Sequence, residues 1–80
     1  MKKSVQLFKI LSENEEIRKG YAELGLDEKR NNVQLVQPFG EAGVVVQTHV
    51  FALALALGID EMAITVNDLD RVVVTFMCHE

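Results

Sequence analysis

Hydrophobic residues in the first 25 positions recur at the spacing of an α-helix. Their intervals of three, four and seven positions place them on one side of a helix. They are Leu7, Ile10, Leu11, Ile17, Tyr21 and Leu24. Residues 4–25 are therefore predicted to be helical. A strand over residues 5–11 is the alternative, and we disfavour it because apolar residues stand next to each other there instead of alternating.

The predicted N-terminal helix is expected to be interrupted near its middle. Ser12 is followed three positions later by Glu15, which is the pattern of a capping box and predicts that a second helix begins at Glu13. The break is accordingly expected after Leu11. Gly25 stands where a glycine commonly ends a helix, so the second helix is expected to stop before it.

The next segment predicts a short strand that leads into a helix. Residues 33–37 partly alternate between apolar and polar side chains, and Pro38 ends the strand because it has no N–H for a ladder hydrogen bond. The charged residues 27–32 are interpreted as the connector before this strand. Gly40 and Gly43 flank the expected start of the following helix.

The densest apolar run of the chain, VVVQTHVFALALALG, spans residues 44–58. A membrane span needs about 20 mostly apolar residues, whereas residues 42–59 are fewer and include polar side chains in the middle. A strand is also disfavoured, because alanine is depleted in strands and the run is long for one. Alanine and leucine favour helices, and Gly58 supplies an end, so this run is predicted to be a buried core helix.

Large side chains on this helix fall into two stripes on nearly opposite sides. The first stripe consists of Val46, Val50, Leu53 and Leu57. The second stripe consists of Val44, Thr48, Phe51 and Leu55. A helix that is apolar on both sides is expected to be covered on both sides. One stripe is expected to pack on a sheet, and the other on the N-terminal helices or on a second copy of the chain, which predicts a homodimer.

The C-terminal residues show the alternation of a β-hairpin, with two β-branched runs around the turn-forming residues NDLD. A five-residue loop over 67–71 pairs Val66 with Val72. The side chains expected on the core face are Met62, Ile64, Val66, Val72, Val74 and Phe76. The opposite face carries Ala63, Thr65, Val73, Thr75 and Met77. That face is apolar enough to be a second covered surface.

Residues 1–80 are thus predicted to form a single α+β domain with two layers. It contains N-terminal helices, a short strand, a central buried helix and a C-terminal antiparallel β-hairpin. The pattern leaves open whether the short strand joins the hairpin. A domain of 80 residues buries only a small core, and its single cysteine excludes an internal disulfide, so a partner subunit is expected to supply further stability.

The formal net charge of −4 argues against broad electrostatic binding to nucleic acid. The charge is uneven, because residues 1–30 hold seven basic and six acidic side chains, and the rest of the chain holds one basic and six acidic. A local basic patch is the alternative, formed by Lys2, Lys3, Lys9, Arg18 and Lys19. One cysteine and no recognisable cleavage site favour an unprocessed cytoplasmic protein, and its brevity favours a bacterial or phage-like one.

Few residues point to catalysis or metal binding. His49 lies inside the apolar run, a position that suits a ligand or a general base, but no cysteine or second histidine stands three or four positions away. Cys78 and His79 are metal-binding types, yet neighbours on a strand point to opposite faces. The glycines of PFGEAG lack the rest of a phosphate-binding motif. We therefore expect no metal, no cofactor and no catalysis.

The sequence favours a small protein that acts by protein–protein association, as an adaptor, an inhibitor or a regulatory subunit. The expected interface residues are Phe51, Leu55, Val44, Thr48, His49, Val73 and Met77. An acidic loop with Asp68 and Asp70 is expected to dock a basic partner. Two alternatives remain, namely nucleic-acid binding by the basic patch and a small-ligand site at a dimer interface near His49.

Overall fold

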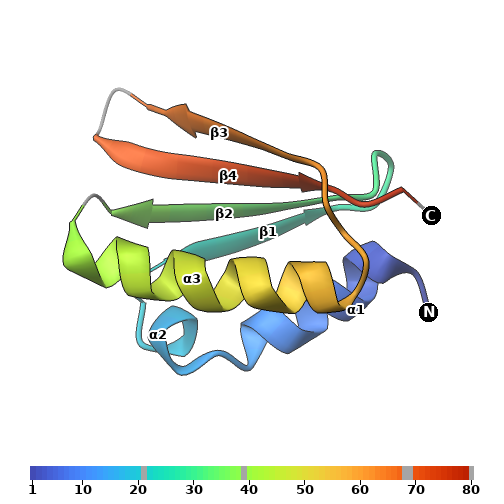
Figure 1. Ribbon diagram of the computed structural model, residues 1–80, viewed down its shortest axis with the longest axis horizontal. Coiled ribbons are helices and arrows are strands. Elements are labelled where there is room, and N and C mark those ends of the chain that lie inside the picture. The colour runs from blue at the N-terminus through green and yellow to red at the C-terminus, as the bar shows by residue number, and fades with distance from the viewer. Residues whose placement is uncertain (21, 39, 68–69, 80) are drawn as a thin grey trace.

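The computed structural model describes residues 1–20, 22–38, 40–67 and 70–79, and its helices lie on one side of a four-stranded antiparallel sheet (Figure 1). The elements in chain order are α1 (Lys3–Ser12), α2 (Glu15–Arg18), β1 (Glu23–Asp27), β2 (Asn32–Pro38), α3 (Glu41–Ala56), β3 (Met62–Val66) and β4 (Arg71–Met77). The strand order is β1-β2-β4-β3, so the predicted short strand, β2, does join the hairpin. The predicted two-layer α+β class is confirmed.

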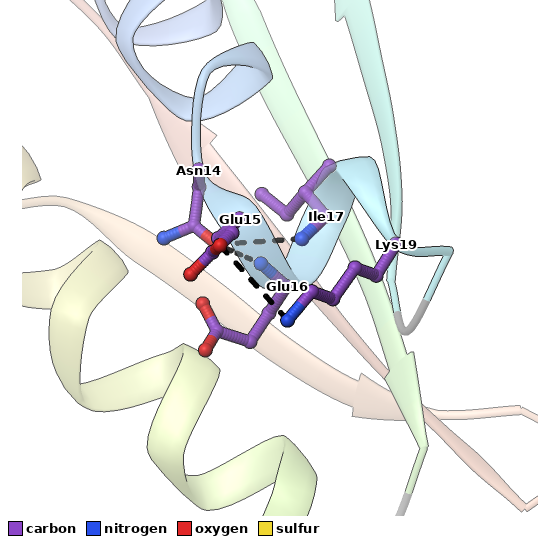
Figure 2. A network of polar contacts seen from close by, with 5 residues as sticks. All are labelled: Asn14, Glu15, Glu16, Ile17 and Lys19. Carbon is purple, nitrogen blue, oxygen red and sulfur yellow. Dashed lines mark hydrogen bonds and ion pairs between the residues drawn. The ribbon is translucent and has the colours of Figure 1, made fainter.

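The expected break in the N-terminal helix is present, but a different residue caps the second helix. α1 ends at Ser12, whose hydroxyl donates a hydrogen bond to the Lys9 carbonyl at 2.7 Å. Asn14 caps α2, because its Oδ1 accepts hydrogen bonds from the backbone N–H groups of Glu16 (2.9 Å) and Ile17 (3.3 Å), as Figure 2 shows. Asn14 thereby satisfies two N–H groups that have no partner inside the helix.

The prediction that the helix continues to residue 24 is wrong. α2 is only four residues long, and Gly20 follows it with a φ of +85°. Leu24 and Leu26 belong to β1, which pairs antiparallel with β2. Gly25 lies within this strand and ends no helix. The two leucines point to the core at the two-residue period of a strand. Their spacing is also compatible with a helix, but the backbone hydrogen bonds of the hairpin with β2 stabilise the strand instead. Tyr21 lies outside the described residues.

The central helix is confirmed as α3, and it ends where the glycine predicts. Gly58 has a φ of +78°, and its N–H donates to the Leu55 carbonyl at 2.9 Å. The N–H of Ile59 donates to the Ala54 carbonyl, also at 2.9 Å. This pair of hydrogen bonds is a Schellman motif, in which glycine adopts the left-handed conformation without strain.

The hairpin register is confirmed, with Val66 opposite Val72 and Met62 opposite Phe76. The core lies between the helices and the inner faces of β1, β2 and β4. Its fully buried large side chains are Leu7, Leu11, Val33, Leu35, Val46, Val50, Val74 and Phe76. α1 packs on β1 and β2, and α3 packs on β2. β3 is the edge strand furthest from α1 and α2 (Figure 1).

Candidate functional site

The second stripe of α3 is only partly covered by the rest of the chain. The first stripe faces the core, where Val50 is fully buried. Phe51 of the second stripe is half-buried, and its ring meets Phe76 edge-to-face with the ring centroids 5.9 Å apart. Val44 and Leu55, by contrast, remain 60% and 61% exposed. The N-terminal helices therefore do not cover this stripe.

The inner face of β3 is also open. Ile64 and Val66 share the core-facing side of the sheet, as predicted, but they are 52% and 58% exposed. Their neighbours Val74 and Phe76 on β4 are fully buried. The expectation that the whole face is buried is thus wrong at its outer edge, where Met62 packs against the core but Ile64 and Val66 stay exposed.

We treat these two exposed apolar regions together and call them the open flank. Its members are Val44, Phe51 and Leu55 of α3, and Met62, Ile64 and Val66 of β3. At 3.6 residues per turn, the three α3 residues lie within about 40° of one another around the helix. The contact of Phe51 with Phe76 links the α3 part of this group to β4, which is the strand next to β3. None of the six side chains is charged.

Among the described residues, most of the large exposed hydrophobic side chains belong to the open flank. The structure exposes seven large hydrophobic side chains among the described residues, and Val44, Leu55, Ile64 and Val66 all belong to this surface. Contiguous exposed apolar patches on small proteins commonly mark an interaction site. Sequence reasoning missed Ile64 and Val66 as interface residues, although the uncharged strand sequence MAITV is a signal of an unprotected strand edge.

Of the two polar interface residues predicted on α3, Thr48 lies beside the open flank and His49 lies away from it. Thr48 is exposed, and its hydroxyl donates to the Val44 carbonyl at 2.9 Å, one helical turn earlier. His49 is exposed on the other side of α3. There it borders a hollow of about 410 Å³ together with Asn14 and Leu53. The structure therefore does not bring His49 together with Phe51 and Leu55.

The remaining predicted contact residues lie on the outer face of the sheet or in the hairpin loop. Val73 and Met77 are half-buried on the side of β4 that faces away from the helices. Asp70 is exposed in the turn, where its N–H donates to the Asn67 carbonyl at 3.2 Å. Asp68 lies outside the described residues. The expected interface is thus divided among three separate surfaces.

The residues of metal-binding type at the C-terminus occupy different environments. Cys78 is buried, with its Sγ 3.7 Å from the Phe76 carbonyl oxygen. His79 is exposed, and its Nε2 contacts the Glu61 carboxylate. Glu80 lies outside the described residues. Within the described part of the chain, no group of three or more histidine, cysteine or acidic side chains is arranged to hold a metal ion.

The basic side chains near the N-terminus are interleaved with acidic and polar ones. Lys19 Nζ lies 4.0 Å from the Glu15 carboxylate on α2 (Figure 2). Lys2 Nζ donates a hydrogen bond to Asn31 Oδ1 at 3.4 Å. These exposed contacts add little stability. Acidic residues accompany the basic ones only at α2, where Glu15 and Glu16 precede Arg18 and Lys19.

Comparisons with protein-family models, with curated proteins and with solved structures found no match. Over the residues that the structure describes, no helix is long and apolar enough to cross a membrane. The open flank is accordingly identified by its geometry and chemistry alone.

Proposed function

We propose that this protein works by protein–protein association, as a cytoplasmic homodimer that uses the open flank as its interface. The observation that carries the proposal is that α3 and the edge strand β3 both leave large apolar side chains exposed, Val44 and Leu55 on the helix and Ile64 and Val66 on the strand. Burial of such a surface in a partner is favourable because it removes hydrocarbon from water. The other candidate surfaces support binding less well, since the hollow beside His49 has that single ionisable side chain in its lining.

In this proposal the dimer is the working unit, as an adaptor, an inhibitor or a regulatory subunit. The open flank supplies the stability that a small core lacks. The outer face of the sheet and the hairpin turn around Asp70 remain exposed in the dimer, where they are available to a further protein partner.

The substitution Leu55→Glu tests the proposal. Leu55 is 61% exposed, so a folded monomer tolerates a carboxylate there, whereas a dimer interface would bury the charge without a partner. Ala56→Glu is the matched control, because it adds the same charge at the next exposed position of α3, turned about 100° away. Molar mass is measured by light scattering over a range of concentrations, and circular dichroism checks that each variant is folded.

The expected mass is twice that of the chain for the unsubstituted protein and for Ala56→Glu, and that of one chain for Leu55→Glu. A chain that is monomeric at every concentration contradicts the proposal. A Leu55→Glu variant that keeps the dimer mass contradicts it equally, because the charge would then lie outside the interface.

A further inference from the structure

Among the described residues, β3 is the last strand on its side of the sheet, so one side of its backbone points away from β4. Asn67 N–H donates to the Arg71 carbonyl at 3.0 Å, and Met77 N–H donates to the Glu61 carbonyl at 2.9 Å. Residues 61 and 67 therefore turn their backbone polar groups toward β4. Because these groups alternate along an antiparallel strand, the even-numbered residues between them turn their N–H and C=O groups toward the open edge. These residues are Met62, Ile64 and Val66.

The two edges of the sheet differ in their protection against pairing with another strand. β1, at one edge, carries Glu23 and Asp27 at its ends and Gly25 at its centre. β3, at the other edge, has the sequence MAITV, which contains no charge, no proline and no glycine. An exposed apolar edge of this kind is a template for β-pairing, and charged residues are a common means by which proteins block such pairing.

We propose that β3 pairs antiparallel with β3 of a second copy, with Ile64 directly opposite Ile64 of that copy. This inference rests on the proposed function and specifies the partner and the register of its interface. The two four-stranded sheets join into one continuous sheet of eight strands. The two-fold axis is perpendicular to the sheet, so the helices of both copies lie on the same side and the two open flanks face each other.

The alternation of backbone N–H and C=O groups between the two sides of β3 favours this register. A two-fold axis at Ile64 pairs Ile64 with its own copy and Met62 with Val66 of the other chain, so all three outward-facing residues find partners within the strand. If the two-fold axis passed through Ala63, Val66 would lie beyond the end of the partner strand and would have no residue opposite it there. If the axis passed through Thr65, Met62 would have no residue opposite it. The register at Ile64 therefore forms the most backbone hydrogen bonds between the strands.

The side chains fit the same register. On the inner face Ile64 meets Ile64 of the second copy, and Met62 meets Val66, so every cross-strand pair is apolar. On the outer face the pairs join Ala63 with Thr65, which are both small. No charge within the strand opposes another. A second copy matches both features of this surface at once, the unpaired backbone and the apolar flank, because it presents the same two features itself.

Cysteine cross-linking measures the register directly. Three variants of the full chain are compared under mild oxidation: Ala63→Cys, Ile64→Cys and Thr65→Cys. In the proposed register the two Cα atoms at position 64 are about 5.5 Å apart, within the range of a disulfide. Those at position 63, or at position 65, are about 8 Å apart, which is too far. The unsubstituted chain, with Cys78 buried, is the background control.

We expect rapid cross-linking of Ile64→Cys alone, and of a mixture of Ala63→Cys with Thr65→Cys. Cross-linking of Ala63→Cys alone or Thr65→Cys alone overturns the register. A dimer by light scattering in which none of these variants cross-links overturns the pairing of β3 and leaves the proposed association intact. A monomer at every concentration, without cross-linking, overturns both.

Proline substitution provides a second test that depends on the backbone. The N–H of Ile64 points to the open edge, so Ile64→Pro leaves the hydrogen bonds between β3 and β4 in place, and edge strands accept proline at such positions. We expect Ile64→Pro to remain folded and to weaken dimerisation about tenfold or more. Thr65→Pro removes an N–H that faces β4 and is expected to lower the melting temperature instead. An unchanged dimer in Ile64→Pro contradicts the pairing.

Discussion

Gly43 is the position where a substitution is expected to have the opposite effect from the one that helix propensity predicts. Replacing a glycine inside a helix by alanine ordinarily stabilises the helix by about 1 kcal/mol. At Gly43 a Cβ atom would overlap the backbone carbonyl oxygen of Pro38, at the end of β2. This oxygen belongs to the main chain of the sheet, so it has no side-chain rotation with which to move aside.

The free-energy cost of Gly43→Ala follows from the shift of the backbone that the added Cβ atom requires. For this Cβ atom and the Pro38 carbonyl oxygen to reach ordinary contact, the first turn of α3 must shift by about 1 Å away from β2. Overpacking of this kind costs about 1–3 kcal/mol. We expect the upper end of this range for Gly43→Ala because the contact is with backbone. The propensity gain offsets about 1 kcal/mol, which leaves a net loss of about 2 kcal/mol.

Gly25→Ala is the matched control, because a Cβ atom at Gly25 meets nothing within 4 Å. Replacement of a strand glycine by alanine is expected to stabilise the protein by about 0.5–1 kcal/mol. Both variants are measured by urea unfolding in the Leu55→Glu background, so that dimerisation does not alter the apparent stability. With an m-value of about 1 kcal/mol per molar, the midpoint falls by about 2 M for Gly43→Ala and rises for Gly25→Ala. A Gly43→Ala variant as stable as the parent would refute the tight contact between α3 and β2.

Two further substitutions test local features of the fold by the same unfolding measurement. Asn14→Ala is expected to lower the free energy of unfolding by about 1 kcal/mol through loss of the α2 cap, whereas Ser12→Ala has a small effect; the reverse order would mean that Ser12 is the cap. Gln37 is 2% exposed, and its Oε1 accepts no hydrogen bond from the described residues. Gln37→Met is therefore expected to raise stability by about 1 kcal/mol, and a loss would show that the carboxamide is satisfied.

The elements that could be predicted from the sequence are those whose signals are local. Residues 52–57 alternate the strong helix formers alanine and leucine, and Gly58 follows them, so local signals are enough to predict this part of α3. The hairpin of β3 and β4 is determined by alternation and by the length of its loop, which together set the pairing of Val66 with Val72.

β1 was missed because its signal is short and its stability comes from a partner. Leu24 and Leu26 alternate over only five residues, and Leu24 also falls at a helical spacing from Ile17. A five-residue strand is held by the ladder that it forms with β2, which local propensity does not describe. Gly20, rather than Gly25, marks the point where the helical conformation ends.

The sequence alone determined which side chains of this protein share a face, because the periods of helix and strand are properties of the backbone. It placed Val44 with Leu55 on α3, and Ile64 with Val66 on the hairpin. Only the tertiary structure decided which of those faces are covered. α1 and α3 pack over β1 and β2, so the inner face is buried as far as β4 and open at β3. The extent of that cover depends on contacts between segments far apart in the chain, and it leaves the open flank for a partner.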